Sequence, residues 1–426
     1  MDNNRCLTCC IITHEIADMF SAGGDRMREA GVAVIGGGAA GLFAGCFLKM
    51  NGADLVILER NTECGLKLLI TGHGRCNITN LKEPRELKRG YHEASNFVYP
   101  AINSFPPSAC VRFIEDEVGI RLKTEENDRV FPVSDKASDI RDGLVRYIGK
   151  DRIITGFKCV SIRKDDALFE IVSEDDSMVK AKYVILACGG MSYPHTGSDG
   201  SGFKLASALG HSIAKPAAAL ATVNTSAEFC GPLAGVTVPG VVLTLYDRGA
   251  KRAVSRGDLL FTHKGISGPS VMELSREIPA RPDNTYILAD LAPGITDRSL
   301  TELIDSKPRA LFATVLASLV PRRLAESLLD DTQIKCSGVT SAERKKILGR
   351  LKRFRFDINE APDINSAYCT RGGVELSELD RKSFGSGIIP GLFIIGENTD
   401  VDGISGGYNL AFAAASAHLA VKSIVG

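Results

Sequence analysis

Three glycines and one acidic residue near the N-terminus have the types and spacing needed to hold a dinucleotide. They are Gly36, Gly38, Gly41 and Glu59. Gly36 allows a tight turn, Gly38 lets backbone N–H groups approach a pyrophosphate, and Gly41 lets a helix pack closely on a strand. Glu59, eighteen residues beyond Gly41, can accept hydrogen bonds from both ribose hydroxyls. Its charge would repel a 2′-phosphate, which disfavours NADP as the dinucleotide bound here.

The elements that must position these residues are visible around them. Residues 32–35 form a short β-branched strand directly before Gly36, and a helical pattern runs from residue 42 to a stop at Asn51-Gly52. A second apolar strand, residues 55–58, ends at Glu59. Strand, glycines, helix, strand and acid in this order predict a Rossmann unit, whose helix N-terminus stabilises the phosphate charge.

The rest of the chain distinguishes FAD from NAD. Beyond the first unit the sequence predicts strands at residues 153–157, 159–163, 167–172, 177–180, 183–188 and 391–396. The strands at 159–163, 167–172 and 177–180 form a meander, whereas an NAD dehydrogenase would continue with alternating strands and helices. The last strand ends at Glu397, before a helix. We therefore predict an α/β fold, a glutathione-reductase-like FAD domain of the two-dinucleotide-binding type. Only one complete fingerprint is present, so we expect NADH or NADPH to bind transiently.

The chain divides into a discontinuous cofactor domain and an insert. We expect residues 27–215 and 357–426 to bind FAD, residues 216–295 to form a β-rich insert, and residues 296–356 to be helical because leucines recur there at helical spacing. The insert is interpreted as a lid or wall of the substrate pocket. Residues 1–26 lack the pattern of a targeting signal, and we expect translation to begin at Met27.

Composition narrows the function classes. Lys plus Arg and Asp plus Glu both number 51, so the formal net charge is zero. We therefore expect no nucleic-acid or membrane partner, and the basic residues between 345 and 355 are interpreted as a solvated helix face. The longest uncharged run, residues 31–48, contains three consecutive glycines and is not interpreted as membrane-spanning. Twelve cysteines without zinc-ligand spacing predict no metal site and favour a reducing, cytoplasmic location.

Three separated segments resemble one family of bacterial flavoproteins. They run from Lys67 to Asn80, from Cys188 to Gly200, and from Gly396 to Leu410. Members of that family are described as aminoacetone oxidase-like or 3-dehydro-bile-acid Δ4,6-reductase-like FAD enzymes, and the resemblance covers residue 30 to the C-terminus. His73 stands where the family commonly has glycine.

The fingerprint and the resemblance together give the candidate site. The expected cofactor-binding residues are Gly36, Gly38, Ala39, Ala40, Gly41, Glu59, Arg60, Lys67, Arg75, Asn77, Thr79, Gly189, Gly396, Glu397, Gly407 and Asn409. Arg75, Asn77 and Thr79 are placed near the pyrophosphate or the flavin edge, or else they tie together a tight loop. His195 is the first candidate for proton transfer, with Tyr193 and Tyr408 as rivals, because the loop that carries it follows a strand ending beside the cofactor.

The expected activity is that of an FAD-dependent oxidoreductase, monomeric or homodimeric, acting on a small molecule. NADH or NADPH would reduce FAD, and the flavin would pass hydride to an enone, which the resemblance makes a bile-acid-like or steroid-like 3-oxo-4-ene. An amine oxidase that uses oxygen is the alternative enzyme. A flavoprotein that associates with RNA without turnover is a third possibility, which the zero net charge disfavours.

Overall fold

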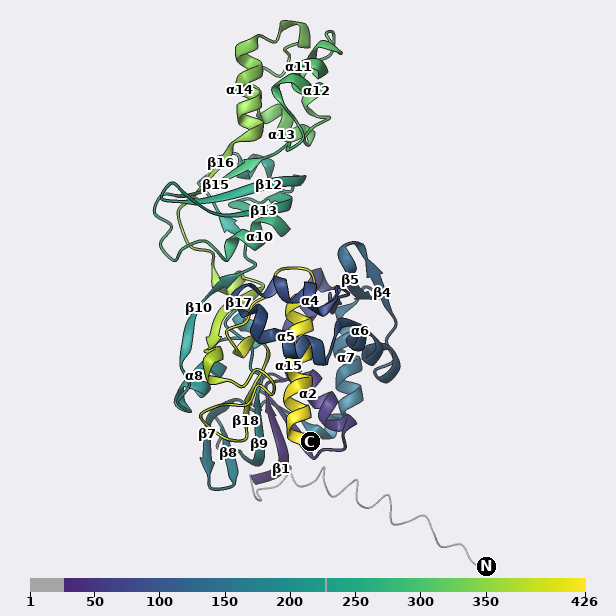
Figure 1. Ribbon diagram of the computed structural model, residues 1–426, viewed down its shortest axis with the longest axis vertical. Coiled ribbons are helices and arrows are strands. Elements are labelled where there is room, and N and C mark those ends of the chain that lie inside the picture. Colours follow the sequence, from purple (N-terminus) through teal and green to yellow (C-terminus); the bar gives the residue numbers. More distant parts are fainter. Residues whose placement is uncertain (1–26, 227) are drawn as a thin grey trace, which may run out of the picture.

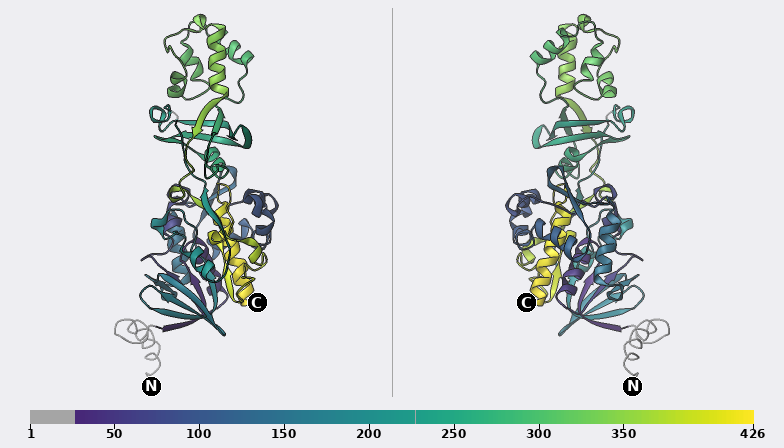
Figure 2. Two further views of the ribbon diagram at one scale, coloured as in Figure 1. Left: turned by 90° about the vertical axis from the view of Figure 1, so that its left-hand side faces the viewer. Right: turned by 90° about the vertical axis from the view of Figure 1, so that its right-hand side faces the viewer.

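The computed structural model describes residues 27–226 and 228–426. The predicted leader, residues 1–26, lies outside the described residues. Figures 1 and 2 show three parts stacked along the long axis: a large α/β domain, a sheet beyond it, and a bundle of short helices at the far end. We name them the dinucleotide domain, the insert sheet and the helical tip.

A seven-stranded sheet forms the centre of the dinucleotide domain. Its order is β6-β2-β1-β9-β8-β7, and β18 pairs with β9 off this path. The strands are β1 (Met27–Ile35), β2 (Leu55–Glu59), β6 (Ile153–Thr155), β7 (Cys159–Asp165), β8 (Leu168–Ser173), β9 (Met178–Leu186) and β18 (Leu392–Ile394). Strands β6, β2, β1, β9 and β18 pair in parallel. Parallel pairing brings the carboxyl ends of β1, β2 and β18 to one edge, where the fingerprint glycines, Glu59 and Glu397 follow them.

One strand differs from the sequence-based expectation. Residues 177–180 and 183–188 were expected to form separate strands, but β9 runs unbroken from Met178 to Leu186. The exposed Lys182 does not interrupt the strand, because its side chain points to solvent while Ala181 and Val184 are buried. Strands β8 and β18 pair with the same edge of β9. Strand β8 pairs with the first half of β9, and β18 pairs with the second half, which β8 does not reach.

Helices cover the central sheet. The long ones are α2 (Ala39–Met50), α5 (Ser95–Ser104), α7 (Ala137–Ile148) and α15 (Tyr408–Val425), and the shorter ones are α3 (Leu66–Ile70), α4 (Pro84–Leu87), α6 (Pro107–Arg112) and α8 (Ser201–Ala208). Helix α2 packs against α15, with Phe43 and Phe47 buried in the shared core. A small sheet of β3 (Thr79–Asn80), β5 (Arg129–Pro132) and β4 (Leu122–Glu125) lies beside them. No helix in the described part of the chain is long and apolar enough to cross a membrane.

Two antiparallel strands, β10 (Ile213–Ala219) and β17 (Cys369–Val374), lead from the dinucleotide domain to the insert. The insert sheet has the order β11-β14-β13-β12-β15-β16. Its strands are β11 (Val223–Asn224), β12 (Thr237–Asp247), β13 (Ala250–Phe261), β14 (Gly265–Ser267), β15 (Thr285–Asp290) and β16 (Phe354–Ile358), accompanied by α9 (Cys230–Leu233) and α10 (Pro269–Ser275).

The helical tip is inserted between β15 and β16. It consists of α11 (Asp297–Asp305), α12 (Phe312–Leu316), α13 (Arg322–Ser327) and α14 (Ser341–Lys352). Thr296 and Thr340 close capping boxes at the starts of α11 and α14. Residues 354–356, which we assigned to the helical region, belong to β16, because Phe354, Phe356 and Ile358 alternate towards the insert core.

Candidate cofactor site

A cavity with about 1260 Å³ of space, part of it open to solvent, runs along the carboxyl edge of the central sheet. One end is lined by Glu59, Phe157 and Cys159, and the other by Lys67, Glu397 and Asn409. The insert sheet and the helical tip contribute no residue to the lining among the described residues. The wall expected from the insert is instead made by Tyr368 and Cys369, at the start of β17.

The fingerprint glycines form the turn that their spacing predicts. Gly36 has a φ of +102°, and a Cβ there would lie 2.5 Å from the carbonyl oxygen of Ala187. A Cβ on Gly41 would lie 1.9 Å from the carbonyl oxygen of Gly36. By contrast, a Cβ on Gly38 would meet no atom within 4 Å, because Gly38 faces the cavity. The turn therefore leaves an open cradle at the N-terminus of α2, a position that would favour a pyrophosphate.

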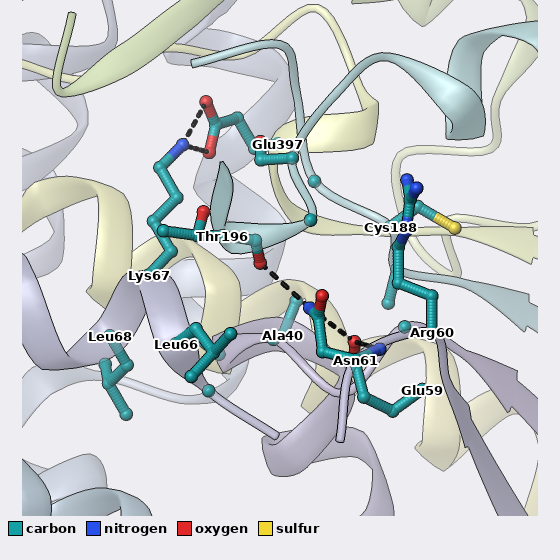
Figure 3. A pocket seen from close by; sticks show the side chains of 18 of the residues that line it. Ala40, Glu59, Arg60, Asn61, Leu66, Lys67, Leu68, Cys188, Thr196 and Glu397 are labelled. Atoms are coloured by element: carbon teal, nitrogen blue, oxygen red, sulfur yellow. Dashed lines mark hydrogen bonds and ion pairs between the residues drawn. The ribbon is translucent and has the colours of Figure 1, made fainter. Parts of the chain in front are cut away.

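Glu59 lies at the end of β2 with 6% of its surface exposed. Its carboxylate accepts hydrogen bonds from the backbone N–H of Gly37 at 2.7 Å and from Asn61 at 2.8 Å. Burial raises the pKa of Glu59, and these hydrogen bonds oppose the shift. Asn61 also donates to the carbonyl oxygen of Thr196 at 3.1 Å, so it bridges two cavity walls (Figure 3).

Lys67 and Glu397 point towards each other across the other half of the cavity (Figure 3). The Nζ atom of Lys67 lies 3.0 and 2.8 Å from the two carboxylate oxygens of Glu397, and it donates to the hydroxyl of Ser192 at 2.6 Å. The backbone N–H of Thr370 donates to Glu397 at 2.7 Å. Four segments distant in sequence therefore meet at this ion pair.

The residues at the start of α15 fit a large polar ligand. A Cβ on Gly407 would lie 2.5 Å from the carbonyl oxygen of Thr79 and 3.0 Å from Oδ1 of Asn77. Asn77 Oδ1 and Thr79 Oγ1 are buried without a hydrogen-bond partner among the described residues. Buried polar atoms normally have partners, so the protein leaves two polar oxygens unsatisfied close to this helix N-terminus, behind the cavity lining. Among the residues that line the cavity, the open cradle at Gly38 is the feature that fits FAD.

The predicted residues divide into two groups by position. Those that line the cavity are Gly36, Gly38, Ala39, Ala40, Glu59, Arg60, Lys67, Gly189, Glu397 and Asn409. Gly41, Asn77, Thr79, Gly396 and Gly407 stand behind the lining, and a Cβ on Gly396 would lie 2.7 Å from Cβ of Ala40. Arg75 is absent from the cavity, because its guanidinium pairs with Glu125 and Asp135 and covers the ring of Phe131. The prediction that Arg75 contacts the cofactor is therefore wrong for this structure.

The candidates for proton transfer lie at different depths. His195 is exposed, and its ring contacts that of Tyr193. Tyr193 is half-buried, and its ring lies 5.9 Å from that of Tyr368, which lines the cavity. Burial, followed by the neighbouring Tyr368, raises the pKa of Tyr193 and keeps its phenol protonated. The phenol of Tyr408 packs away from the cavity, against the ring of Tyr91 and beside Gly90.

Several cavity residues were not predicted from the sequence. They include Asn61, Phe157, Thr196, Tyr368 and Cys369. Tyr368 follows a loop next to the insert boundary, and nothing in its neighbours marks it as a cavity residue. The ring of exposed His73 also lies 6.4 Å from that of Tyr368, so the position that departs from the family pattern is at the cavity mouth. In the sequence, only the presence of His73 in place of the family's usual glycine pointed to this position.

Known proteins resemble this chain both in sequence and in fold. The chain is 28% identical over 410 residues to the 3-dehydro-bile acid delta(4,6)-reductase of Clostridium scindens, covering 92% of this chain and 98% of the relative. It is also 28% identical over 417 residues to the ribosomal RNA dihydrouridine synthase of Escherichia coli, covering 94% and 99%. The fold is shared with the 3-ketosteroid delta1-dehydrogenase of Sterolibacterium denitrificans, with a TM-score of 0.51, 12% identity, and coverage of 93% of this chain and 99% of that one.

The match to a family model extends over almost the whole described chain. Residues 30–423 match the HI0933-like protein Rossmann domain. The stretch begins in β1 and ends in α15, so it includes both halves of the dinucleotide domain and the insert between them. The predicted fold class is thereby confirmed: the chain belongs to the HI0933-like Rossmann family and is an FAD-dependent oxidoreductase.

Proposed function

We propose that the protein reduces a carbon–carbon double bond conjugated to a carbonyl group. This proposal rests on the kind of bond that the two relatives described above are named for reducing. One is named a delta(4,6)-reductase of a 3-dehydro bile acid, and the other a dihydrouridine synthase. Both substrates contain a carbon–carbon double bond conjugated to a carbonyl group. In the steroid this is the 3-oxo-4-ene, and in uracil it is the C5=C6 bond next to the C4 carbonyl. Both accept a hydride at the β-carbon and a proton at the α-carbon.

When bound, FAD would supply the hydride for this reduction with NADH or NADPH as the reductant of the flavin, so that the nicotinamide would be oxidised and the double bond reduced. The glycine cradle and Glu59 hold the dinucleotide, while Lys67 and Glu397 fix the walls of the cavity around it. The N-terminus of α15 faces the same region and favours negative charge there. These roles are positional and electrostatic, which is how proteins usually assist a cofactor.

Tyr193 is the residue that we assign to the proton step. Its phenol stays protonated at neutral pH, and its ring lies against Tyr368 at the cavity wall. A positioned acid of this kind contributes roughly 10²-fold to 10⁴-fold to a rate. Tyr193→Phe is therefore expected to lower turnover of an enone about 100-fold, while reduction of the bound FAD by NADH continues unchanged. Tyr246→Phe is the matched control, because Tyr246 lies in β12 of the insert sheet and does not line the cavity.

Two substrate classes satisfy this chemistry. The first is a bile-acid-like or steroid-like enone, and the second is a uracil base within RNA. The RNA substrate is favoured by an observation beyond the name of a relative, namely the charge of the helical tip described below. An amine donor with oxygen as acceptor is the competing enzyme activity.

The test is to mix the FAD-loaded protein with NADH or NADPH without oxygen and to follow the oxidised flavin absorbance. Rapid loss of this band, followed by its return on addition of a 3-oxo-4-ene steroid or of uridine-containing RNA, is the expected result. A band that persists with both nicotinamides but bleaches with an amine such as aminoacetone would replace the proposal with the amine oxidase.

A further inference from the structure

The helical tip has no part in the cavity. It stands at the end of the molecule away from the dinucleotide domain, beyond the insert sheet (Figure 1). Its buried residues, among them Leu300, Phe312 and Leu351, share one core with the insert sheet. The tip is therefore a packed unit held at a distance from the cofactor site, and its surface is available for a different contact.

The charge of the chain is divided between the tip and the rest. Residues 296–353 contain 12 Lys and Arg against 7 Asp and Glu, a formal net charge of +5. The remaining residues contain 39 Lys and Arg against 44 Asp and Glu, a net charge of −5. We expected no nucleic-acid partner because the net charge of the whole chain is zero. The charge is nevertheless distributed unevenly, with a positive tip and a negative remainder.

Six cations of the tip are exposed and form no ion pair with any residue in the described ranges 27–226 and 228–426, namely Lys307, Arg309, Arg323, Lys335, Lys345 and Arg353. Three of these six lie on two neighbouring loop segments. They are Lys307, Arg309 and Lys335. Other tip cations are paired, as Arg344 is with Asp297 at 3.2 Å and Arg322 with Glu326 at 2.9 Å. Unpaired exposed cations keep their full charge for a partner, whereas each paired cation is already partly neutralised.

The backbone brings these three cations together. Segments 307–312 and 334–337 run antiparallel, with Cys336 N–H donating to Ala310 at 2.9 Å and Phe312 N–H donating to Ile334 at 2.9 Å. In this pairing Lys335 lies directly opposite Leu311. Arg309 is two positions before Leu311 on the same segment. We call Lys307, Arg309 and Lys335 the basic tip surface.

We propose that the basic tip surface docks the phosphate backbone of RNA whose base enters the cavity. Lys and Arg contacts to phosphates position a nucleic acid without reading its sequence. A substrate that touches both the tip and the cavity must extend past the insert sheet, which a folded polymer does and a small enone does not. The proposal rests on the RNA form of the proposed function.

The test compares two triple charge reversals in the FAD-loaded protein. The tip variant carries Lys307→Glu, Arg309→Glu and Lys335→Glu. The control variant carries Lys204→Glu, Arg381→Glu and Lys382→Glu, which make the same charge change at exposed positions of the dinucleotide domain. Binding of purified, protein-free ribosomal RNA is measured at several salt concentrations. A second tip variant with Lys307→Arg and Lys335→Arg keeps the charge.

The tip reversal is expected to weaken RNA binding at least about 10-fold and to reduce the slope of log K against log salt by about 2. That slope change corresponds to three phosphate contacts at roughly 0.7 each. The control and the Lys→Arg variant should bind nearly as the unmodified protein does. Equal weakening by the control and the tip reversal, or no RNA binding by the unmodified protein, would overturn the proposal. So would binding to vesicles containing phosphatidylglycerol that competes with RNA.

Failure of this surface is distinguishable from failure of the proposed function. If NADH still bleaches the flavin and a small enone still restores it, but RNA does not bind, only the docking surface is wrong. If RNA binds through the tip but neither RNA nor a steroid enone reoxidises the flavin, the docking surface stands and the proposed reaction is wrong. Flavin content and circular dichroism of each variant establish that it is folded.

Discussion

Lys67 Nζ lies 2.8 Å from Oε2 of Glu397, although the two residues are 330 positions apart in the chain. Lys67 comes from α3, directly after the first Rossmann unit, and Glu397 follows the last strand of the central sheet. Their side chains are 20% and 23% exposed, so the pair is partly shielded from water. The contact joins the two ends of the discontinuous dinucleotide domain at the cavity wall.

Removing the cation of this pair should weaken FAD binding. Lys67→Met leaves the Glu397 carboxylate at the cavity wall with hydrogen-bond donors but no counter-charge. We expect the dissociation constant for FAD to rise about 10-fold, which corresponds to about 1.4 kcal/mol. Titration of the apoprotein with FAD, followed by flavin fluorescence, measures this change. Lys180→Met is the matched control, because it breaks an ion pair with Glu170 outside the cavity. Unchanged affinity in the Lys67 variant would contradict the role of the pair.

Two glycines of the fingerprint should respond to alanine in opposite ways. Gly38→Ala adds a methyl group where no protein atom lies within 4 Å, so the apoprotein should keep its melting temperature. That methyl group enters the pyrophosphate cradle, and FAD binding should fall by a factor of 10 or more. Gly41→Ala places its Cβ 1.9 Å from the Gly36 carbonyl oxygen, so it should destabilise the apoprotein itself, by about 1–3 kcal/mol.

The comparison of these two variants separates the cofactor contact from packing. Thermal unfolding of the apoproteins and FAD titration of both variants are needed. The assignment of the cradle would be wrong if Gly38→Ala bound FAD as tightly as the unmodified protein. A Gly41→Ala apoprotein with an unchanged melting temperature would show that the turn relaxes without cost.

Local pattern predicted the part of the site that depends on neighbours in sequence. The strand, glycines, helix and Glu59 follow one another closely, so their geometry is determined by the chain itself. The contacts of Arg75, by contrast, are not determined by its neighbours in sequence. Its loop lies near the cavity, but its side chain pairs with Glu125 and Asp135, which come from a hairpin some fifty residues later. A sequence does not reveal which of several partners an arginine will choose.

Charge summed over the whole chain also concealed a local feature. The basic residues between 345 and 355 were interpreted as a solvated helix face, and the structure pairs several of them, such as Lys352 with Asp290 at 2.6 Å. Lys345 and Arg353 of that run form no ion pair among the described residues. Three more unpaired cations, Lys307, Arg309 and Lys335, lie outside the run and are brought together by the backbone pairing of two loop segments. Counting charges by structural unit would have shown the asymmetry.

The junction between the dinucleotide domain and the insert depends on a buried ion pair. Arg276, after α10, donates to Asp402 at 2.8 Å and to Glu93 at 2.6 Å, and the Arg276 and Asp402 side chains are 9% and 5% exposed. Arg276→Met leaves a buried carboxylate without its cation, and we expect a loss of about 3–5 kcal/mol of stability. Adding Asp402→Asn should recover part of this loss, since the uncompensated charge is removed.

Chemical denaturation of the single and double variants measures both effects. Arg298→Met is the control, because Arg298 and its partner Glu302 are 90% and 64% exposed. A surface pair of this kind is worth at most about 1 kcal/mol. If Arg276→Met and Arg298→Met cost the same, the buried pair does not hold the two parts together.

The stability of the protein should fall in mild acid because of His418. This residue of α15 lies between Phe47 and Phe105, with ring centroids at 5.4 and 4.9 Å, and its Nδ1 has no partner among the described residues. Burial lowers the pKa of His418 below its ordinary value of 6.5, and Lys422 adds to the shift. The folded state therefore keeps the imidazole neutral, while the unfolded chain takes up a proton below about pH 6.5.

More protons bound in the unfolded state mean that the free energy of unfolding decreases as pH falls through 6.5 towards the folded pKa. The contribution of one such group reaches roughly 1.4 kcal/mol per pH unit. His418→Phe keeps the aromatic packing and removes this group, so its melting temperature should fall less than that of the unmodified protein between pH 7.5 and 5.5. His195→Phe, at an exposed position, should leave the slope as it is. Parallel pH profiles for the unmodified protein and His418→Phe would show that acid acts through other groups, such as the partly buried His92, whose pKa burial also lowers.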